Sequence, residues 1–175
     1  DRVFRHATGV MELRGIPNPN DHKKLQGRPH GLKGFDEATE LLEAQVRFIM
    51  GWMRSEDEAV IPQALMTFNP PTTIEGRWVI KYFGPWLDKK HRNKAADGEI
   101  RLFTTIGGVD EETEDDRPFV LHNEEKIYDF DPEEFAPELV IRPKSRTFIH
   151  SKVSDNPYYM RTGYVSTLQA MPEPL

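Results

Sequence analysis

The sequence predicts an α/β fold, in which a parallel layer of strands and helices is followed by a smaller α+β region. Two short apolar segments, 32–35 and 59–71, are separated by a stretch with helical periodicity, and a second helical stretch follows them. This alternation of strand and helix is typical of a parallel sheet. After about residue 87, short strand-like segments and charged loops replace the alternation, which predicts a second subdomain.

Three helices are expected, over Glu40–Arg54, Gly76–Leu87 and Met160–Met171. In the first, apolar residues recur at intervals of three and four: Leu42, Val46, Ile49 and Met53. Thr39 is the expected N-cap of this helix. In the second, Trp78, Tyr82 and Trp86 have helical spacing, which favours the core over a base-stacking surface.

The expected strands begin with a hairpin over Val3–Ile16, turning at Ala7-Thr8-Gly9. A loop rich in Pro, Asn and Gly spans 17–29, and an acidic loop is expected over 110–116. Further short strands are expected in three segments: 99–106, 117–130 and 145–153.

Composition limits the class of protein. The 175 residues are 37% hydrophobic and 30% charged, as in a polar globular domain, and no apolar run approaches the roughly 20 residues that span a bilayer. The absence of cysteine excludes disulfides and thiolate metal sites. The net charge of −6 argues against a domain that binds nucleic acid by itself, because phosphate binding needs a clustered positive surface, although it leaves room for local basic patches. The basic residues between 88 and 94 are either a phosphate contact or, more simply, a solvated loop.

Two adjacent acids, Asp36 and Glu37, follow the first strand of the predicted parallel layer. At the carboxyl end of such a strand, one acid can hold Mg²⁺ and the next can orient and deprotonate a water that attacks a phosphate. A simpler interpretation is that the pair only provides negative charge at the start of a helix.

Thr67 and Asn69 follow the next strand, directly before two prolines. Because neighbouring parallel strands lie about 4.8 Å apart, we expect these side chains to lie close to Asp36 and Glu37. The competing interpretation is that Asn-Pro-Pro merely forms a turn.

Together, "GRPHGLKGFDEATE" (27–40) and "LMTFNPP" (65–71) resemble the large terminase subunit of tailed bacteriophages and prophages, the ATPase that drives DNA into the empty capsid. The resemblance continues in "GEIRLFTTIGG" (98–108) and in the final "SRTFIHSKVSDNPYYMRTGYVSTLQAMPEPL" (145–175). It implies part of a P-loop ATPase core of the additional-strand, RecA-like type over residues 1–75, and a small α+β lid subdomain over 76–175.

The resemblance also implies roles for individual residues. Asp36 would bind the Mg²⁺ of ATP, and Glu37 would be the catalytic base. Thr67 and Asn69 would sense the terminal phosphate of the nucleotide. Arg28 would be an arginine finger offered to a neighbouring subunit, although a surface arginine in a Pro/Gly loop is an equally simple interpretation. The implied partners are double-stranded DNA, the portal protein, the small terminase subunit and further copies in a ring, in the cytoplasm of a bacterial host and docked on the procapsid.

The chain departs from the family pattern in three respects. It has no G-x-x-x-x-G-K-[ST] phosphate loop, no recognisable nuclease carboxylate cluster, and a Lys and a Gly inside its first parallel strand. It also begins at Asp1 within a strand-like segment. We therefore expect a fragment that hydrolyses ATP poorly by itself. The alternatives are another P-loop motor ATPase and an inactive prophage remnant.

Overall fold

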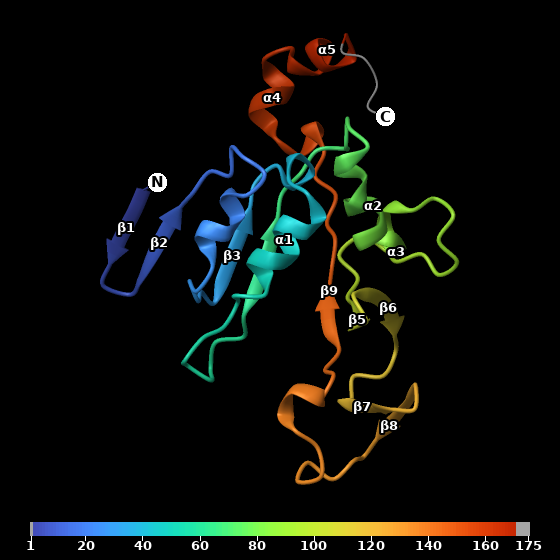
Figure 1. The fold of residues 1–175 in the computed structure, drawn as a ribbon. Helices are drawn as coiled ribbons and strands as arrows, with labels where there is room; N and C mark the ends of the chain where they lie inside the picture. The colour runs from blue at the N-terminus through green and yellow to red at the C-terminus, as the bar shows by residue number, and fades with distance from the viewer. Residues whose placement is uncertain (1, 171–175) are drawn as a thin grey trace. The chain divides into compact units, whose positions relative to one another are not determined.

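The computed structural model describes residues 2–170, which mix short helices with short strands (Figure 1). The chain divides into two compact units, with the boundary between Trp78 and Val79. Within the described residues, no helix is both long and apolar enough to cross a bilayer.

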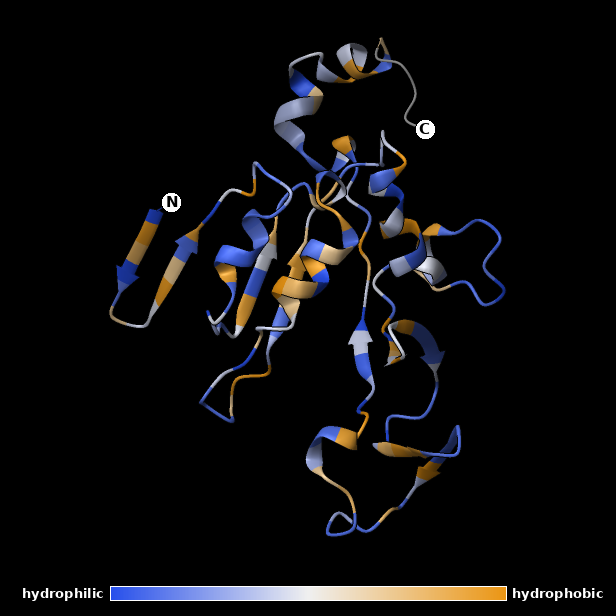
Figure 2. Cartoon of the chain, in the orientation of Figure 1, coloured by the Kyte–Doolittle hydropathy of each residue, from blue (hydrophilic) through white to orange (hydrophobic). Residues whose placement is uncertain are grey.

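The first unit opens with the expected hairpin, formed by β1 (Arg2–His6) and β2 (Gly9–Leu13) in antiparallel register. Apolar side chains remain exposed on it, among them Phe4, which is opposite Met11. Figure 2 shows an apolar stretch within each of the two strands, bordered by hydrophilic residues. The hairpin leads through a loop containing a short 3-10 helix, η1 (Asp21–Leu25), to the sheet.

The centre of the first unit is a parallel pair of strands, β3 (Leu32–Phe35) and β4 (Gln63–Met66). The expected parallel layer is thus confirmed, although β4 is shorter than the apolar segment that predicted it. Helix α1 (Glu43–Met50) contacts β3 and connects it to β4. Val46 and Ile49 of α1 are buried, as is Phe35 of β3, so this helix–strand contact forms the core.

The first predicted helix is shorter than expected, and its start was misplaced. Thr39 is not the cap of α1, because it lies buried in a separate 3-10 helix, η2 (Ala38–Glu40). The N-cap position is Leu42, whose backbone N–H donates a 2.9 Å hydrogen bond to the Gln45 side chain. The extended backbone at 41 and 42 is what separates η2 from α1.

The second predicted helix is divided into three pieces: η3 (Glu75–Arg77), α2 (Trp78–Tyr82) and α3 (Gly84–Leu87). Pro85 cannot donate the backbone hydrogen bond of a continuous helix, so α3 starts anew at Gly84. The expectation of core aromatics is confirmed for Trp78 and Tyr82, which are buried, while Trp86 is half-buried.

The second unit is built on a three-stranded antiparallel sheet, in the order β6 (Val109–Thr113), β5 (Arg101–Ile106) and β9 (Lys144–Arg146). A separate hairpin joins β7 (Phe119–His122) to β8 (Glu125–Tyr128). The prediction of an acidic loop over 110–116 is wrong for its first part, since β6 pairs with β5 there. The expected strand over 145–153 ends at Arg146.

Arg146 explains why an acidic segment can join this sheet. Its guanidinium donates a 2.6 Å hydrogen bond to Asp110 and a 3.0 Å bond to the Tyr82 carbonyl oxygen. The same group stacks on the ring of Tyr82 at 3.7 Å and on the ring of Phe103 at 4.3 Å. Arg146 thus neutralises a carboxylate of β6 inside the aromatic core of the unit.

The final predicted helix is instead a pair of short helices, α4 (Pro157–Arg161) and α5 (Tyr164–Gln169). Gly163 lies between them with φ of 68°, a left-handed conformation that interrupts a helix. Met171, the expected helix end, lies outside the described residues. Two more 3-10 turns, η4 (Pro137–Leu139) and η5 (Val153–Asp155), complete the unit.

Candidate functional site

The candidate site lies where the parallel strands β3 and β4 end. Phe35 is paired with Met66 as the last residue of each strand, so Asp36 and Thr67 follow side by side. The backbone continues the pairing: Thr67 N–H donates to the Phe35 carbonyl at 2.9 Å, and Ala38 N–H donates to the Thr67 carbonyl at 2.9 Å. The chain after β3 therefore folds over the end of β4, as the parallel topology predicts.

A side-chain hydrogen bond joins the two strand ends. The Thr67 hydroxyl donates to Asp36 Oδ1 at 2.6 Å, and the backbone N–H of Glu37 approaches the same oxygen at 3.2 Å. Asp36 Oδ2 has no hydrogen-bond partner anywhere in residues 2–170, and Asp36 is exposed. The carboxylate is therefore oriented through one oxygen, while the other faces no competing donor.

Glu37 holds an unusual backbone conformation directly beside this contact. Its φ of 49° and ψ of 51° are left-handed, a region that costs an ordinary residue about 1–2 kcal/mol. The turn is held by Glu40, whose N–H donates to the Glu37 carbonyl at 2.8 Å. Strained residues concentrate at functional sites, and here the left-handed turn comes directly after Asp36 and leaves Glu37 exposed.

Comparisons with protein-family models, with curated proteins and with solved structures found no match to this chain.

Asn69 is exposed and lies two residues beyond Thr67, in the segment that leads to Pro70 and Pro71. Its side chain makes no hydrogen bond within the part of the chain that the structure describes. The structure thus keeps Asn69 near the strand ends by connectivity, whereas only Thr67 contacts Asp36 directly.

Arg28 lies at the opposite end of β3 from Asp36. Residues 29–35 separate them, and the four residues of β3 among these alone correspond to about 13 Å of extended chain. Arg28 Nη1 instead forms an ion pair with Glu12 of β2 at 3.0 Å. Burial pushes the pKa of Glu12 upward, but the hydrogen bond and charge of Arg28, helped by Arg14, lower that pKa below its usual value. Arg28 is therefore not brought to the two acids within one chain.

Lys33 explains the polar residue inside β3. Its side chain is buried, and Nζ donates to the Arg28 carbonyl at 2.9 Å and to Nδ1 of His30 at 3.0 Å. Burial lowers the pKa of Lys33, and the charge of Arg28 adds to this, while Glu12 opposes it. Sequence reasoning missed this role, although the Lys33-x-Phe35 spacing places both side chains on one face of the strand.

The residues present suit one part of a Mg²⁺-nucleotide site. Mg²⁺ prefers oxygen ligands and is commonly held by one or two carboxylates together with phosphates and water. Asp36 and Thr67 supply such oxygens, and Glu37, the next residue after Asp36, supplies an exposed carboxylate that makes no hydrogen bond or ion pair within residues 2–170. Among the described residues, no group of three His, Asp or Glu side chains could hold a metal by itself.

Proposed function

We propose that this chain is part of a DNA-packaging motor of the large terminase type, an ATPase of the P-loop class that couples hydrolysis to translocation of double-stranded DNA. The proposal is carried by one observation: the Asp36–Thr67 hydrogen bond at the carboxyl ends of two parallel strands, with Glu37 next to it. The sequence resemblance, which assigns roles to the same residues, supports it.

In this proposal the chain's own residues divide the work of hydrolysis. Bound Mg²⁺-ATP would supply the reacting phosphate and neutralise its developing charge. Asp36 would hold the metal through Oδ2, since Oδ1 already accepts the hydrogen bond of Thr67. Glu37 accepts the proton of the attacking water. Thr67 would sense the phosphate indirectly, because a movement of Asp36 would change the hydrogen bond between the two side chains.

The proposed motor needs parts that these residues do not supply. No phosphate loop occurs in the sequence, so the chain by itself lacks a backbone cradle and a lysine for the phosphates. Arg28 would act on the site of a neighbouring copy in a homo-oligomeric ring, which agrees with its place away from Asp36. The portal protein, the small terminase subunit and the procapsid are the proposed partners in the bacterial cytoplasm.

The first test is to read the coding DNA upstream of the Asp1 codon. An open frame that encodes a strand, a Gly-rich loop ending in Lys-Ser or Lys-Thr, and a helix is the expected result. Phosphate release by that longer chain should then be abolished by Glu37→Gln and kept by Glu40→Gln, which changes a nearby exposed acid. Full turnover by the Glu37→Gln chain would contradict the proposal.

Such an experiment also separates the motor from its alternatives. A stop codon or unrelated sequence upstream would favour the inactive remnant. The 175-residue chain without a phosphate loop should release phosphate no faster than buffer. If the 175-residue chain did hydrolyse ATP, and Glu37→Gln abolished that activity, the proposal that these residues need a separate phosphate loop would be wrong.

A further inference from the structure

The loop between α3 and β5 concentrates positive charge in an otherwise acidic chain. We define the basic loop as residues 88–94; it holds four of the chain's 23 Lys and Arg residues, namely Lys89, Lys90, Arg92 and Lys94. All four are exposed, and none forms an ion pair with any residue in 2–170. Figure 2 shows the outer turn of this loop as hydrophilic.

The backbone of the basic loop is held by its own first residue and by α3. Asp88 Oδ1 accepts a 2.9 Å hydrogen bond from Lys90 N–H, and the Asp88 carbonyl accepts one of 3.0 Å from His91 N–H. Just after the loop, Ala95 N–H donates to the Pro85 carbonyl at 2.9 Å. Asp88 N–H also donates to the Gly84 carbonyl of α3 at 2.9 Å, so both ends of the loop are tied to α3.

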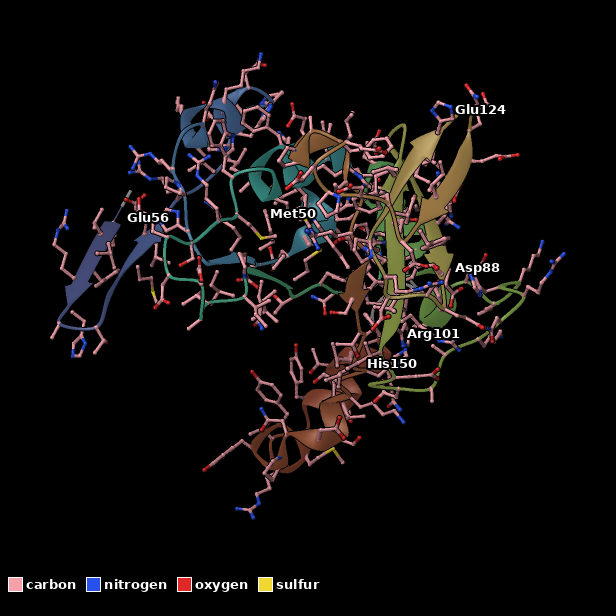
Figure 3. All side chains as sticks on the ribbon, turned by 90° about the horizontal axis from the view of Figure 1, so that it is seen from below. Met50, Glu56, Asp88, Arg101, Glu124 and His150 are labelled. Atoms are coloured by element: carbon pink, nitrogen blue, oxygen red, sulfur yellow. The ribbon has the colours of Figure 1, made fainter. Side chains whose placement is uncertain are left out.

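Polar residues of the sheet support the basic loop from inside. Arg101 of β5 donates to the Lys94 carbonyl at 3.3 Å and to Asn93 Oδ1 at 3.4 Å. Glu112 of β6 accepts from Arg101 at 3.2 Å and lies 3.8 Å from His91 Nε2. Figure 3 shows Asp88 and Arg101 near the base of this loop, whose side chains extend nitrogen-tipped ends away from the ribbon.

Three acids near the basic loop bind groups other than its four cationic side chains, and Glu114, which lines a pocket with Asn93, forms no ion pair with those cations in residues 2–170. Asp88 binds the loop backbone, Glu99 binds Arg101 at 2.8 Å, and Asp97 binds His150 at 2.9 Å. The hydrogen bonds from His150 lower the pKa of Asp97, which keeps that carboxyl ionised in this contact. Within the loop, His91 and Asn93, which lie against Glu112 and Arg101 of the sheet, alternate with the exposed Arg92 and Lys94.

We propose that the basic loop binds the phosphate backbone of double-stranded DNA. Phosphate contacts need clustered cations, and a loop whose backbone is already ordered loses less conformational entropy on binding than a mobile one. The contact carries no sequence information, since Lys and Arg on phosphates position a duplex without reading its bases. The choice of DNA as the polyanion rests on the proposed function, while the location of the contact rests on the loop itself.

The test measures binding of the 175-residue chain to a fluorescein-labelled 30-base-pair duplex at several salt concentrations. The variant Lys89→Gln/Lys90→Gln/Arg92→Gln/Lys94→Gln should abolish most binding and reduce the slope of log K against log salt by about 3–4. Each of two double variants should produce about half of that reduction in slope: Lys89→Gln/Lys90→Gln and Arg92→Gln/Lys94→Gln. Far-UV circular dichroism checks that each variant is folded.

The matched control removes the same charge elsewhere. Lys23→Gln/Lys81→Gln/Lys144→Gln/Arg161→Gln changes three lysines and one arginine that are exposed and scattered over both units. This control should keep the salt slope. An equal loss of binding in the control, or binding of phosphatidylserine vesicles with no binding of DNA, would overturn the proposal. The Glu37→Gln chain should bind DNA as the parent does. DNA binding by the basic loop is therefore tested independently of the proposed ATPase site.

Discussion

The Thr67 hydroxyl donates a 2.6 Å hydrogen bond to Asp36 across 31 positions of sequence, and it is the only side-chain hydrogen bond of Asp36 to another described side chain. It couples the ends of β3 and β4. Replacing Thr67 by Val keeps the side-chain shape and removes the hydroxyl, so we expect a loss of about 0.5–1.5 kcal/mol in the free energy of unfolding.

Urea unfolding followed by tryptophan fluorescence would measure this loss. Thr67→Ser, which retains the hydroxyl, is the control and should remain within about 0.5 kcal/mol of the parent. A Thr67→Val protein as stable as the parent would mean that the hydrogen bond contributes nothing to the fold.

The left-handed conformation of Glu37 predicts that removing its side chain stabilises the chain. Glu37→Gly relieves a cost of about 1–2 kcal/mol, so the midpoint of urea unfolding should rise by an amount that corresponds to about 1 kcal/mol. Glu40→Gly, in the adjacent 3-10 turn, lacks this strain and should lower stability by about 0.5–1 kcal/mol. Equal destabilisation by the two variants would show that Glu37 is unstrained in solution.

Among the charged residues of the second unit, Arg146 is the one whose substitution is expected to lower stability most. Its side chain and that of Asp110 are each only 11% exposed, so Arg146→Ala removes the counter-charge of a largely buried carboxylate, to which the Thr105 hydroxyl still donates at 2.8 Å, and should cost about 3–5 kcal/mol. Arg146→Lys keeps the charge but loses the planar stacking on Tyr82 and Phe103, so it should still unfold at a clearly lower temperature than the parent.

The control for Arg146 is Arg117→Ala. Arg117, like Arg146, forms ion pairs with carboxylates, in its case Asp115 and Asp129, but its side chain is 52% exposed. Thermal unfolding should show a much smaller shift for this variant, because solvent screens exposed pairs. A similar shift for both variants would contradict the central role of Arg146.

The Glu12–Arg28 pair predicts that the free energy of unfolding depends on pH in the acid range. The pKa of Glu12 is lowered in the folded chain, so the pair's stabilisation is fully present above the unfolded value of 4.5 and is lost as pH falls through the lower folded value. Below pH 4.5 the parent should therefore lose stability more steeply than Glu12→Gln.

Urea midpoints between pH 2.5 and pH 7 would show this difference. Glu56→Gln, a change at an exposed acid outside any ion pair of the described residues, controls for net charge and should follow the parent curve. Parallel curves for the parent and Glu12→Gln would indicate that Arg28 is free in solution to act elsewhere.

Local patterns in the sequence were enough to predict the hairpin of β1 and β2, the parallel pair β3 and β4, and the proximity of Asp36 to Thr67. These features depend on alternation, turn residues and the rule that parallel strands end at the same edge of a sheet. Helix ends were predicted less well, since α1 starts where Gln45 binds the Leu42 N–H and not at Thr39.

Tertiary structure alone decided the rest. The acidic segment 110–113 forms a strand because Arg146, 36 residues away, neutralises Asp110 within an aromatic core. Arg28 is bound to Glu12, 16 residues before it, and Glu37 is left-handed because the chain must cross the end of β4. Sequence patterns report the preferences of neighbouring residues, whereas these arrangements arise from partners that only folding brings together.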